Sequence, residues 1–160
     1  MKGNSTHNLA ILFGVMLFSA LIGTTLLSCD DSWELVASAY LSAITITDET
    51  GHMIGGSDED WGCEPSNDPD AEFLWCLYPA SPNPAQGRTI ISFSIPVACH
   101  VKIAIHNVYK GHVETLVDRD FEQPGPRQTE WDASSYNSGL YWCYMWAGDF
   151  ECKGRILIIQ

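Results

Sequence analysis

The sequence predicts an all-β protein built around one β-sandwich of about seven strands, over residues 73–160. Short segments in which apolar and polar residues alternate follow one another through this region. That period of two is typical of strands with one buried face. Glycine, proline and asparagine separate the segments at the spacing expected of a sandwich.

The strands of this region can be placed in order. Residues 89–95 and 101–106 alternate most clearly, and Ile91 and Phe93 share the predicted inner face. Residues 78–84 contain three prolines, which lack a backbone donor, so we expect this segment at a sheet edge. The remaining strands are expected at 73–77, 113–118 and 127–132, and in a closing hairpin of 140–146 with 150–159.

The first 28 residues have the pattern of an export signal. Lys2 stands in a short polar start, and an apolar run from Leu9 to Ile22 follows it. This run has the length of a signal-peptide core and is short for a membrane span. An uncleaved signal anchor over residues 9–27 is the alternative.

A tetrapeptide, Leu26-Leu27-Ser28-Cys29, follows the apolar run. It resembles the lipobox of bacterial lipoproteins, which implies cleavage before Cys29 and a diacylglycerol on the Cys29 thiol. Two or three acyl chains anchor a protein far more firmly than one. The two aspartates after Cys29 resemble both an inner-membrane retention signal and a surface-export signal, so the leaflet stays open.

Residues 29–72 are predicted to be an acidic neck. From Asp30 to Glu72 there are twelve of the twenty acidic residues and no Lys or Arg. A turn between alternating segments predicts a small hairpin over 44–54, whereas residues 33–44 fit helical spacing and alternation alike. Residues 55–72 lack EF-hand spacing and are expected to be a solvated spacer. We therefore expect the sandwich to fold without the neck.

Six cysteines in an exported chain favour disulfides. Cys143 and Cys152 lie on the two arms of the closing hairpin. A two-residue turn at Ala147-Gly148 would place them opposite each other, at a separation that a disulfide spans. Cys63 and Cys76 bracket the acidic loop and form the second candidate pair.

Trp142, Tyr144 and Trp146 share one face of a strand. We expect this stripe to be an inner face of the sandwich, and stacking on sugars is the alternative. His100 and His106 share a strand face, but strand geometry separates them by about 20 Å, too far for one metal ion.

Motifs of catalysis are not found in the sequence. It has no phosphate-binding glycine loop, no Gly-x-Ser-x-Gly and no His-Glu-x-x-His. Cys99 has no evident partner, and both a bond to Cys63 or Cys76 and a free thiol stay open. We therefore expect no enzyme, cofactor or metal, and the net charge of −12 argues against nucleic acid.

Motifs that follow one another from Tyr78 to the carboxyl end resemble a bacterial immunoglobulin-like module. The matching segments are Tyr78–Pro84 with its Pro82-Asn83-Pro84, Ile91–Pro96, Asn107–Gly111, Thr115–Asp118, Trp131-Asp132, Ser138–Tyr141 and Ala147–Phe150. The order is similar to that of the FlgD-like domains of flagellar hook-capping proteins and of the type A carboxyl-terminal sorting domains of type IX secretion cargo. The resemblance implies an immunoglobulin-like sandwich.

These observations lead to an expected function. We expect a non-enzymatic, lipid-anchored protein of the bacterial cell envelope, whose immunoglobulin-like domain has a structural or interaction role. Its partners would be the membrane, through the lipid, and an unidentified envelope protein or the secretion machinery. A type IX sorting module is the alternative, although no cargo domain separates Cys29 from the module. A carbohydrate-binding module is the third possibility.

Overall fold

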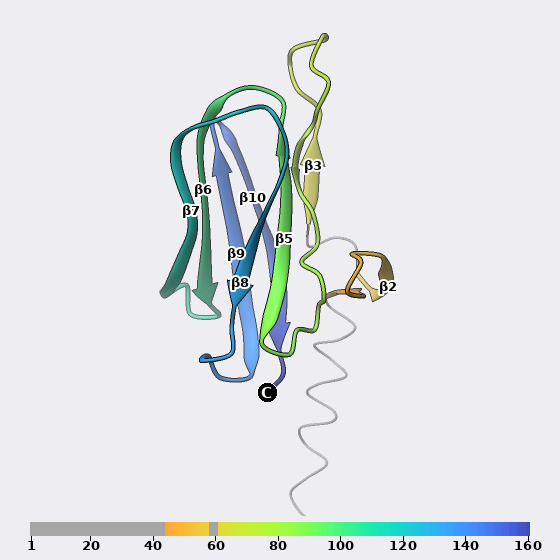
Figure 1. Ribbon diagram of the computed structural model, residues 1–160, viewed down its shortest axis with the longest axis vertical. Coiled ribbons are helices and arrows are strands. Elements are labelled where there is room, and N and C mark those ends of the chain that lie inside the picture. Colours follow the sequence, from red (N-terminus) through yellow and green to blue (C-terminus); the bar gives the residue numbers. More distant parts are fainter. Residues whose placement is uncertain (1–43, 58–60) are drawn as a thin grey trace, which may run out of the picture. The chain divides into compact units, whose positions relative to one another are not determined.

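A computed structural model describes residues 44–57 and 61–160 of the chain. These residues belong to one compact unit and form ten β-strands and no helix, so the predicted all-β class is confirmed. Two four-stranded antiparallel sheets make a sandwich, and a two-stranded sheet accompanies them (Figure 1). Within the described residues there is accordingly no helix with the length and apolarity of a membrane span.

The first sheet has the strand order β10-β9-β6-β7. Its strands are β6 (Cys99–Asn107), β7 (His112–Glu122), β9 (Gly139–Ala147) and β10 (Phe150–Ile158). Each neighbouring pair runs antiparallel. The sheet therefore has β9 and β6 at its centre, with β10 and β7 at its edges.

The second sheet has the order β3-β4-β5-β8. Its strands are β3 (Gly62–Glu64), β4 (Trp75–Leu77), β5 (Arg88–Ile95) and β8 (Gly125–Asp132). Without β3, the seven strands β4 to β10 form one sheet of β4, β5 and β8 and one of β10, β9, β6 and β7. This is the order of an immunoglobulin-like fold in which the fourth strand, here β7, belongs to the larger sheet. The predicted sandwich of about seven strands is thus confirmed, with β3 as an added edge strand.

The core lies between the two sheets, where alternation turns one side of each strand inward. Ile91, Phe93 and Ile95 of β5 are buried as predicted, and Trp131 of the neighbouring strand β8 is fully buried in the same core cluster. Burial of a side chain of this size contributes about 1.5–3 kcal/mol. Other fully buried core residues are Leu77, Ala80, Ala85, Val101, Ile103, Ile105, Cys143, Met145, Ala147, Ile156 and Ile158.

The proline-rich segment passes from one sheet to the other. Ser81 exchanges two backbone hydrogen bonds with Ile90 of β5, at 2.9 and 2.8 Å. Four residues later, Ala85 bonds to the backbone of Leu157 and Ile159 and forms a parallel bridge beside β10. The peptide bonds before Pro82 and Pro84 are cis. The segment thus lies at the edges of both sheets, which agrees with the expected edge position.

The hairpin predicted over 44–54 is present and extends further. It consists of β1 (Thr45–Thr47) and β2 (Met53–Gly56). Ile44 and Thr47 are buried, and the Thr47 Oγ1 donates to the Ala80 carbonyl at 2.5 Å. The backbone of Thr47 also pairs with that of Asn83. The hairpin is therefore packed against the proline-rich segment.

The predicted division between neck and sandwich at residue 73 is corrected by β3. This strand lies inside residues 55–72, which we expected to be spacer, and pairs with β4 from Gly62↔Leu77 to Glu64↔Trp75. Only three residues long and set in an acidic stretch, β3 lacks the alternation that identified the other strands. The second sheet therefore begins at Gly62.

Candidate functional site

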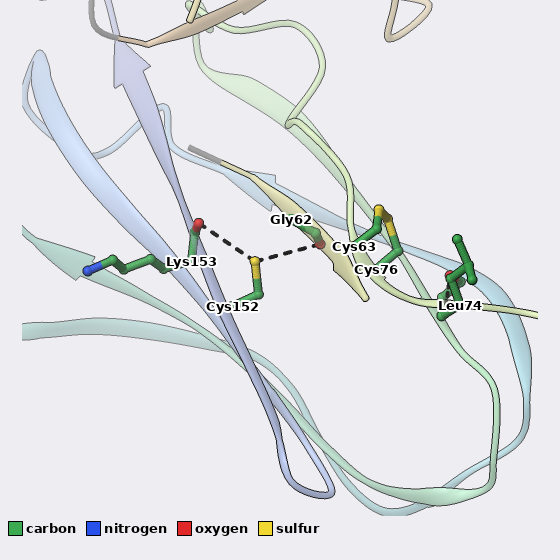
Figure 2. The surroundings of a disulfide bond; sticks show 7 residues. Gly62, Cys63, Leu74, Cys76, Cys152 and Lys153 are labelled. Carbon is green, nitrogen blue, oxygen red and sulfur yellow. Dashed lines mark hydrogen bonds between the residues drawn. A yellow bond between two sulfur atoms is a disulfide. The ribbon is translucent and has the colours of Figure 1, made fainter. Parts of the chain in front are cut away.

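The expected bond between Cys63 and Cys76 is present, and it closes the acidic loop. The two residues are direct cross-strand partners on β3 and β4. Figure 2 shows the bond joining these strands. Because it closes a loop with a sequence separation of 13 residues, it should stabilise the fold by about 3 kcal/mol. The disulfide thus fixes a short edge strand that has few contacts of its own.

Strand β3 brings Trp61 against the sandwich. A Cβ atom added at Gly154 of β10 would lie 2.2 Å from the Trp61 ring, so the indole occupies the place of a side chain. The Trp61 ring nitrogen is buried and has no hydrogen-bond partner among the described residues. The sequence analysis did not predict this contact. In the sequence, the one sign of this contact is that Trp61 follows a run of acidic residues.

The predicted disulfide between Cys143 and Cys152 is not formed, and both are free cysteines in the structure. Ala147 pairs with Phe150, so the turn residues are Gly148 and Asp149. Gly148 stands at the first turn position with a φ of 57°, where a type II′ hairpin needs glycine.

The turn therefore begins one residue later than predicted, which shifts the register by two. Cys152 now faces Met145, and Cys143 faces Gly154. The two thiols become diagonal neighbours on one face, with Cα atoms about 7–8 Å apart, beyond the span of a disulfide. The prediction failed because the glycine was assigned to the wrong position of the turn.

The three free cysteines of the described region are shielded thiols. Cys143 is fully buried, and burial raises the pKa of its thiol. Burial also raises the pKa of Cys152 and of Cys99. The Cys152 thiol lies between the carbonyl oxygens of Gly62 and Lys153, at 3.7 and 3.9 Å (Figure 2). Because the thiolate is the reactive form, these cysteines are poor nucleophiles.

Trp142, Tyr144 and Trp146 lie on the outer side of β9, and the prediction of an inner face is wrong. All three are partly exposed, whereas Cys143 and Met145 between them are fully buried. Both sides of the strand are apolar, so alternation alone could not orient it. Cys143 and Met145 belong to the core cluster, and the three rings take the outer side.

Neighbouring strands add polar side chains to this surface. On β6, Lys102 pairs with Trp146 and His106 with Trp142. On β10, Glu151 pairs with Trp146, Lys153 with Tyr144 and Arg155 with Trp142. We call this surface the aromatic face. It is formed by Lys102, His106, Trp142, Tyr144, Trp146, Glu151, Lys153 and Arg155.

The rings of the aromatic face pack on one another. Tyr144 and Trp146 are stacked, with centroids 5.4 Å apart and planes at 7°. His106 meets both edge-on, at 5.1 Å from Tyr144 and 6.3 Å from Trp146. The three rings therefore pack as one group on the outer side of the sheet.

Cations cover the third ring. The Lys153 Nζ lies 5.0 Å and the Arg155 Cζ 5.6 Å from the centre of the Trp142 ring. Such cation–π contacts are worth about 0.5–1 kcal/mol at exposed sites. The aliphatic parts of both side chains also shield the indole. Both cations therefore lie beside the Trp142 ring on the outer side of the sheet.

A small ion-pair group borders the face. Asp118 of β7 bonds to the His100 Nε2 at 2.9 Å and lies 3.7 Å from the Lys102 Nζ. The hydrogen bond from His100 and the charge of Lys102 hold the pKa of Asp118 below its usual value. Asp118 is therefore ionised at neutral pH and balances part of the positive charge at this end.

The histidines do not converge on one point. His100 bonds to Asp118, while the His106 ring meets the His112 ring edge-on at 5.5 Å. Across residues 44–57 and 61–160, no group of three or more His, Cys, Asp or Glu side chains is placed to hold a metal ion.

The predicted signal peptide, Cys29 and the stretch 33–43 lie outside the described residues. No protein-family model and no curated protein matches the chain.

Proposed function

We propose that this protein is a non-enzymatic, lipid-anchored component of the bacterial cell envelope that binds its partner through the aromatic face. The lipobox-like tetrapeptide ending at Cys29 supports the anchor. An immunoglobulin-like sandwich supports a rigid binding domain, because both sheets hold their surface residues in fixed rows.

The aromatic face is the observation that carries this proposal. Tryptophan, tyrosine and arginine are the residues most enriched where binding energy concentrates. Here Trp142, Tyr144, Trp146 and Arg155 come together on two paired strands, and each is partly exposed. A solvent-facing surface of an isolated domain has no structural need for so many wide rings.

Two measurements test the two halves of the proposal. Mass spectrometry of the mature protein should find an acylated Cys29 at the amino terminus, and Cys29→Ser should block the cleavage. A photo-crosslinking amino acid in place of Tyr144, in cells that make the protein, should form adducts. The same probe in place of Ile90, which is exposed on the other sheet, is the control. Equal adduct yields at both positions would contradict binding through the aromatic face.

A type IX sorting module is the second candidate. The ordered motifs between Tyr78 and Phe150 favour it, since they resemble those of cargo sorting domains. Fusion of residues 44–160 to the end of a secreted reporter, in a host with type IX secretion, tests this candidate. Release of the reporter at the cell surface supports sorting, and retention in the periplasm contradicts it.

A further inference from the structure

We propose that His106 and His112 together bind a divalent transition-metal ion, Cu²⁺ more tightly than Zn²⁺. This site goes beyond the proposed function and does not depend on it. It is carried by the register of the two strands, by the distance between the two rings and by the hydrogen bond that each ring makes.

The strand register places the two histidines directly opposite each other. His106 near the end of β6 pairs with His112 at the start of β7. The register shifts between Ile105 and His106, because Ile105 pairs with Glu114 and Val113 is left out of the pairing. Without this bulge, Val113 and not His112 would face His106. Bulges that re-aim a side chain are typical of edge strands and of functional sites, and β7 is an edge strand.

The distance between the two rings suits a shared metal ion. Their centroids lie 5.5 Å apart, with the planes at 90°. A metal ion lies about 2.1 Å from the imidazole nitrogen that binds it, and therefore about 3.2 Å from the centroid of that ring. Two such ligands, at angles between square and tetrahedral, have centroids about 4.6–5.3 Å apart. Small rotations of the two side chains, both on the outer side of the sheet, close the remaining gap.

Each ring uses one nitrogen in a hydrogen bond and leaves the other for a metal ion. The His106 Nδ1 lies 3.3 Å from the Lys110 carbonyl oxygen. Because a carbonyl oxygen only accepts, this nitrogen carries the proton and the Nε2 keeps its lone pair. The His112 Nε2 lies 2.8 Å from the Thr115 Oγ1, which leaves the Nδ1. Histidines that bind metals are almost always oriented by such a bond from their other nitrogen.

The pair also selects the kind of ion. Imidazole nitrogens suit Cu²⁺, Ni²⁺ and Zn²⁺, with Cu²⁺ bound most tightly, whereas Mg²⁺ and Ca²⁺ take oxygen ligands. Among residues 44–57 and 61–160, no third His, Cys, Asp or Glu completes a larger group, so water fills the remaining positions. The net charge of −12 adds a long-range attraction for cations.

Copper titration of the full chain in detergent micelles tests this site. Copper(II) chloride is the probe, calorimetry gives the affinity, and electron paramagnetic resonance identifies the ligand atoms. We expect a binding step with two imidazole ligands. His106→Asn or His112→Asn should weaken it at least about ten-fold, since loss of even an outer partner of a metal ligand costs that much. His100→Asn is the matched control, because His100 is an exposed histidine of β6 that bonds to Asp118, and should leave the affinity unchanged.

Copper sites elsewhere in the chain are shared by all these variants, so the differences among them report the pair. An equal loss in His100→Asn would overturn the proposal, as would an unchanged affinity in His106→Asn or in His112→Asn. A spectrum of oxygen or sulfur ligands alone would assign the ion to carboxylates or thiols instead. Circular dichroism checks that each variant is folded, and His106→Gln and His112→Gln replace any variant that is not.

Discussion

Asn83 and Leu157 are joined by a hydrogen bond of 2.9 Å from the Leu157 backbone N–H to the Asn83 Oδ1. The Nδ2 of the same buried side chain donates to the carbonyl oxygens of Thr45 and Arg155, at 2.7 and 2.9 Å. One asparagine thus connects the proline-rich segment, the amino-terminal hairpin and the last strand. The Pro82-Asn83-Pro84 motif therefore has a structural role in this domain, apart from any part in sorting.

Asn83→Ala should destabilise the domain by about 3 kcal/mol, because buried backbone groups lose their partner. Urea denaturation of the full chain measures the free energy of unfolding. Asn137→Ala is the matched control, since Asn137 is exposed, and should change stability by less than about 0.5 kcal/mol. Equal effects of the two substitutions would contradict the role of Asn83.

Gly154→Ala should be destabilising by about 1–3 kcal/mol, since the new methyl group overlaps the Trp61 ring. Gly55→Ala is the control in another strand, where the nearest atom is an ordinary contact at 3.7 Å. Thermal unfolding of both variants measures the difference. A Gly154→Ala protein as stable as Gly55→Ala would show that Trp61 does not lie over Gly154.

The pairing of Trp61 with Gly154 can also be tested by a double-mutant cycle. Trp61→Ala removes the ring, so Gly154→Ala should cost little in that background. We therefore expect a coupling free energy of about 1 kcal/mol or more between the two positions. If the effects of the two substitutions on the free energy of unfolding are strictly additive, the contact between Trp61 and Gly154 is contradicted.

For strands in which apolar and polar residues alternate cleanly, the sequence was sufficient to predict which side is buried. In β5, Ile91, Phe93 and Ile95 are buried as predicted, because one polar side and one apolar side leave a single orientation. In β9, Trp142 and Cys143 are both apolar, so the sequence could not say which side faces inward. In the structure Cys143 and Met145 enter the core and the three aromatic rings lie on the outer side.

Features that depend on how strands pair could not be read from the apolar pattern of each segment alone. The register of β9 with β10 depended on whether Gly148 is the first or second residue of the turn, and one position moved Cys143 away from Cys152. Strand β3 is held by a disulfide and by Trp61, both of which act across the fold. Its acidic surroundings gave no sign of a strand, although Cys63 and Cys76 were recognised as a candidate pair.

Peptide mapping under non-reducing conditions should recover Cys63 linked to Cys76. Alkylation of the unfolded, unreduced protein should label Cys99, Cys143 and Cys152. Loss of the disulfide in Cys63→Ser with Cys76→Ser should lower the free energy of unfolding by about 3 kcal/mol. A peptide that links Cys143 to Cys152 would contradict the observed register.

Stability should fall in acid partly through Glu122. Its side chain is only 8% exposed and bonds to Arg119 at 2.8 Å and Arg127 at 3.0 Å. Burial alone would raise the pKa of Glu122, but the bonds from Arg127 and Arg119 outweigh it and lower the pKa. The folded state therefore holds this proton less tightly than the unfolded state.

The contribution of Glu122 to the free energy of unfolding is present above the usual glutamate pKa. It is lost as the pH falls through the lowered pKa of the folded state. We expect Glu122→Gln to flatten the decline of the free energy of unfolding in that acidic range. Glu49→Gln, at an exposed turn residue, is the control and should leave the slope as it is. A Glu122→Gln protein with an unchanged pH profile would rule out this contribution.

A fragment of residues 73–160 should be much less stable than one of residues 44–160. The shorter fragment is the sandwich with the boundary that the sequence predicted. It lacks β3, Trp61 and the disulfide. It also lacks β1, whose residues form hydrogen bonds with Asn83 and Ala80. The disulfide alone accounts for about 3 kcal/mol, and the lost hydrogen bonds add about 1 kcal/mol each. Urea denaturation of the two fragments, side by side under oxidising conditions, measures the difference. Similar free energies of unfolding would mean that the β1–β2 hairpin and β3 add no stability to a sandwich that is complete from residue 73. A broad, non-cooperative transition for the shorter fragment alone would show instead that they are part of its fold.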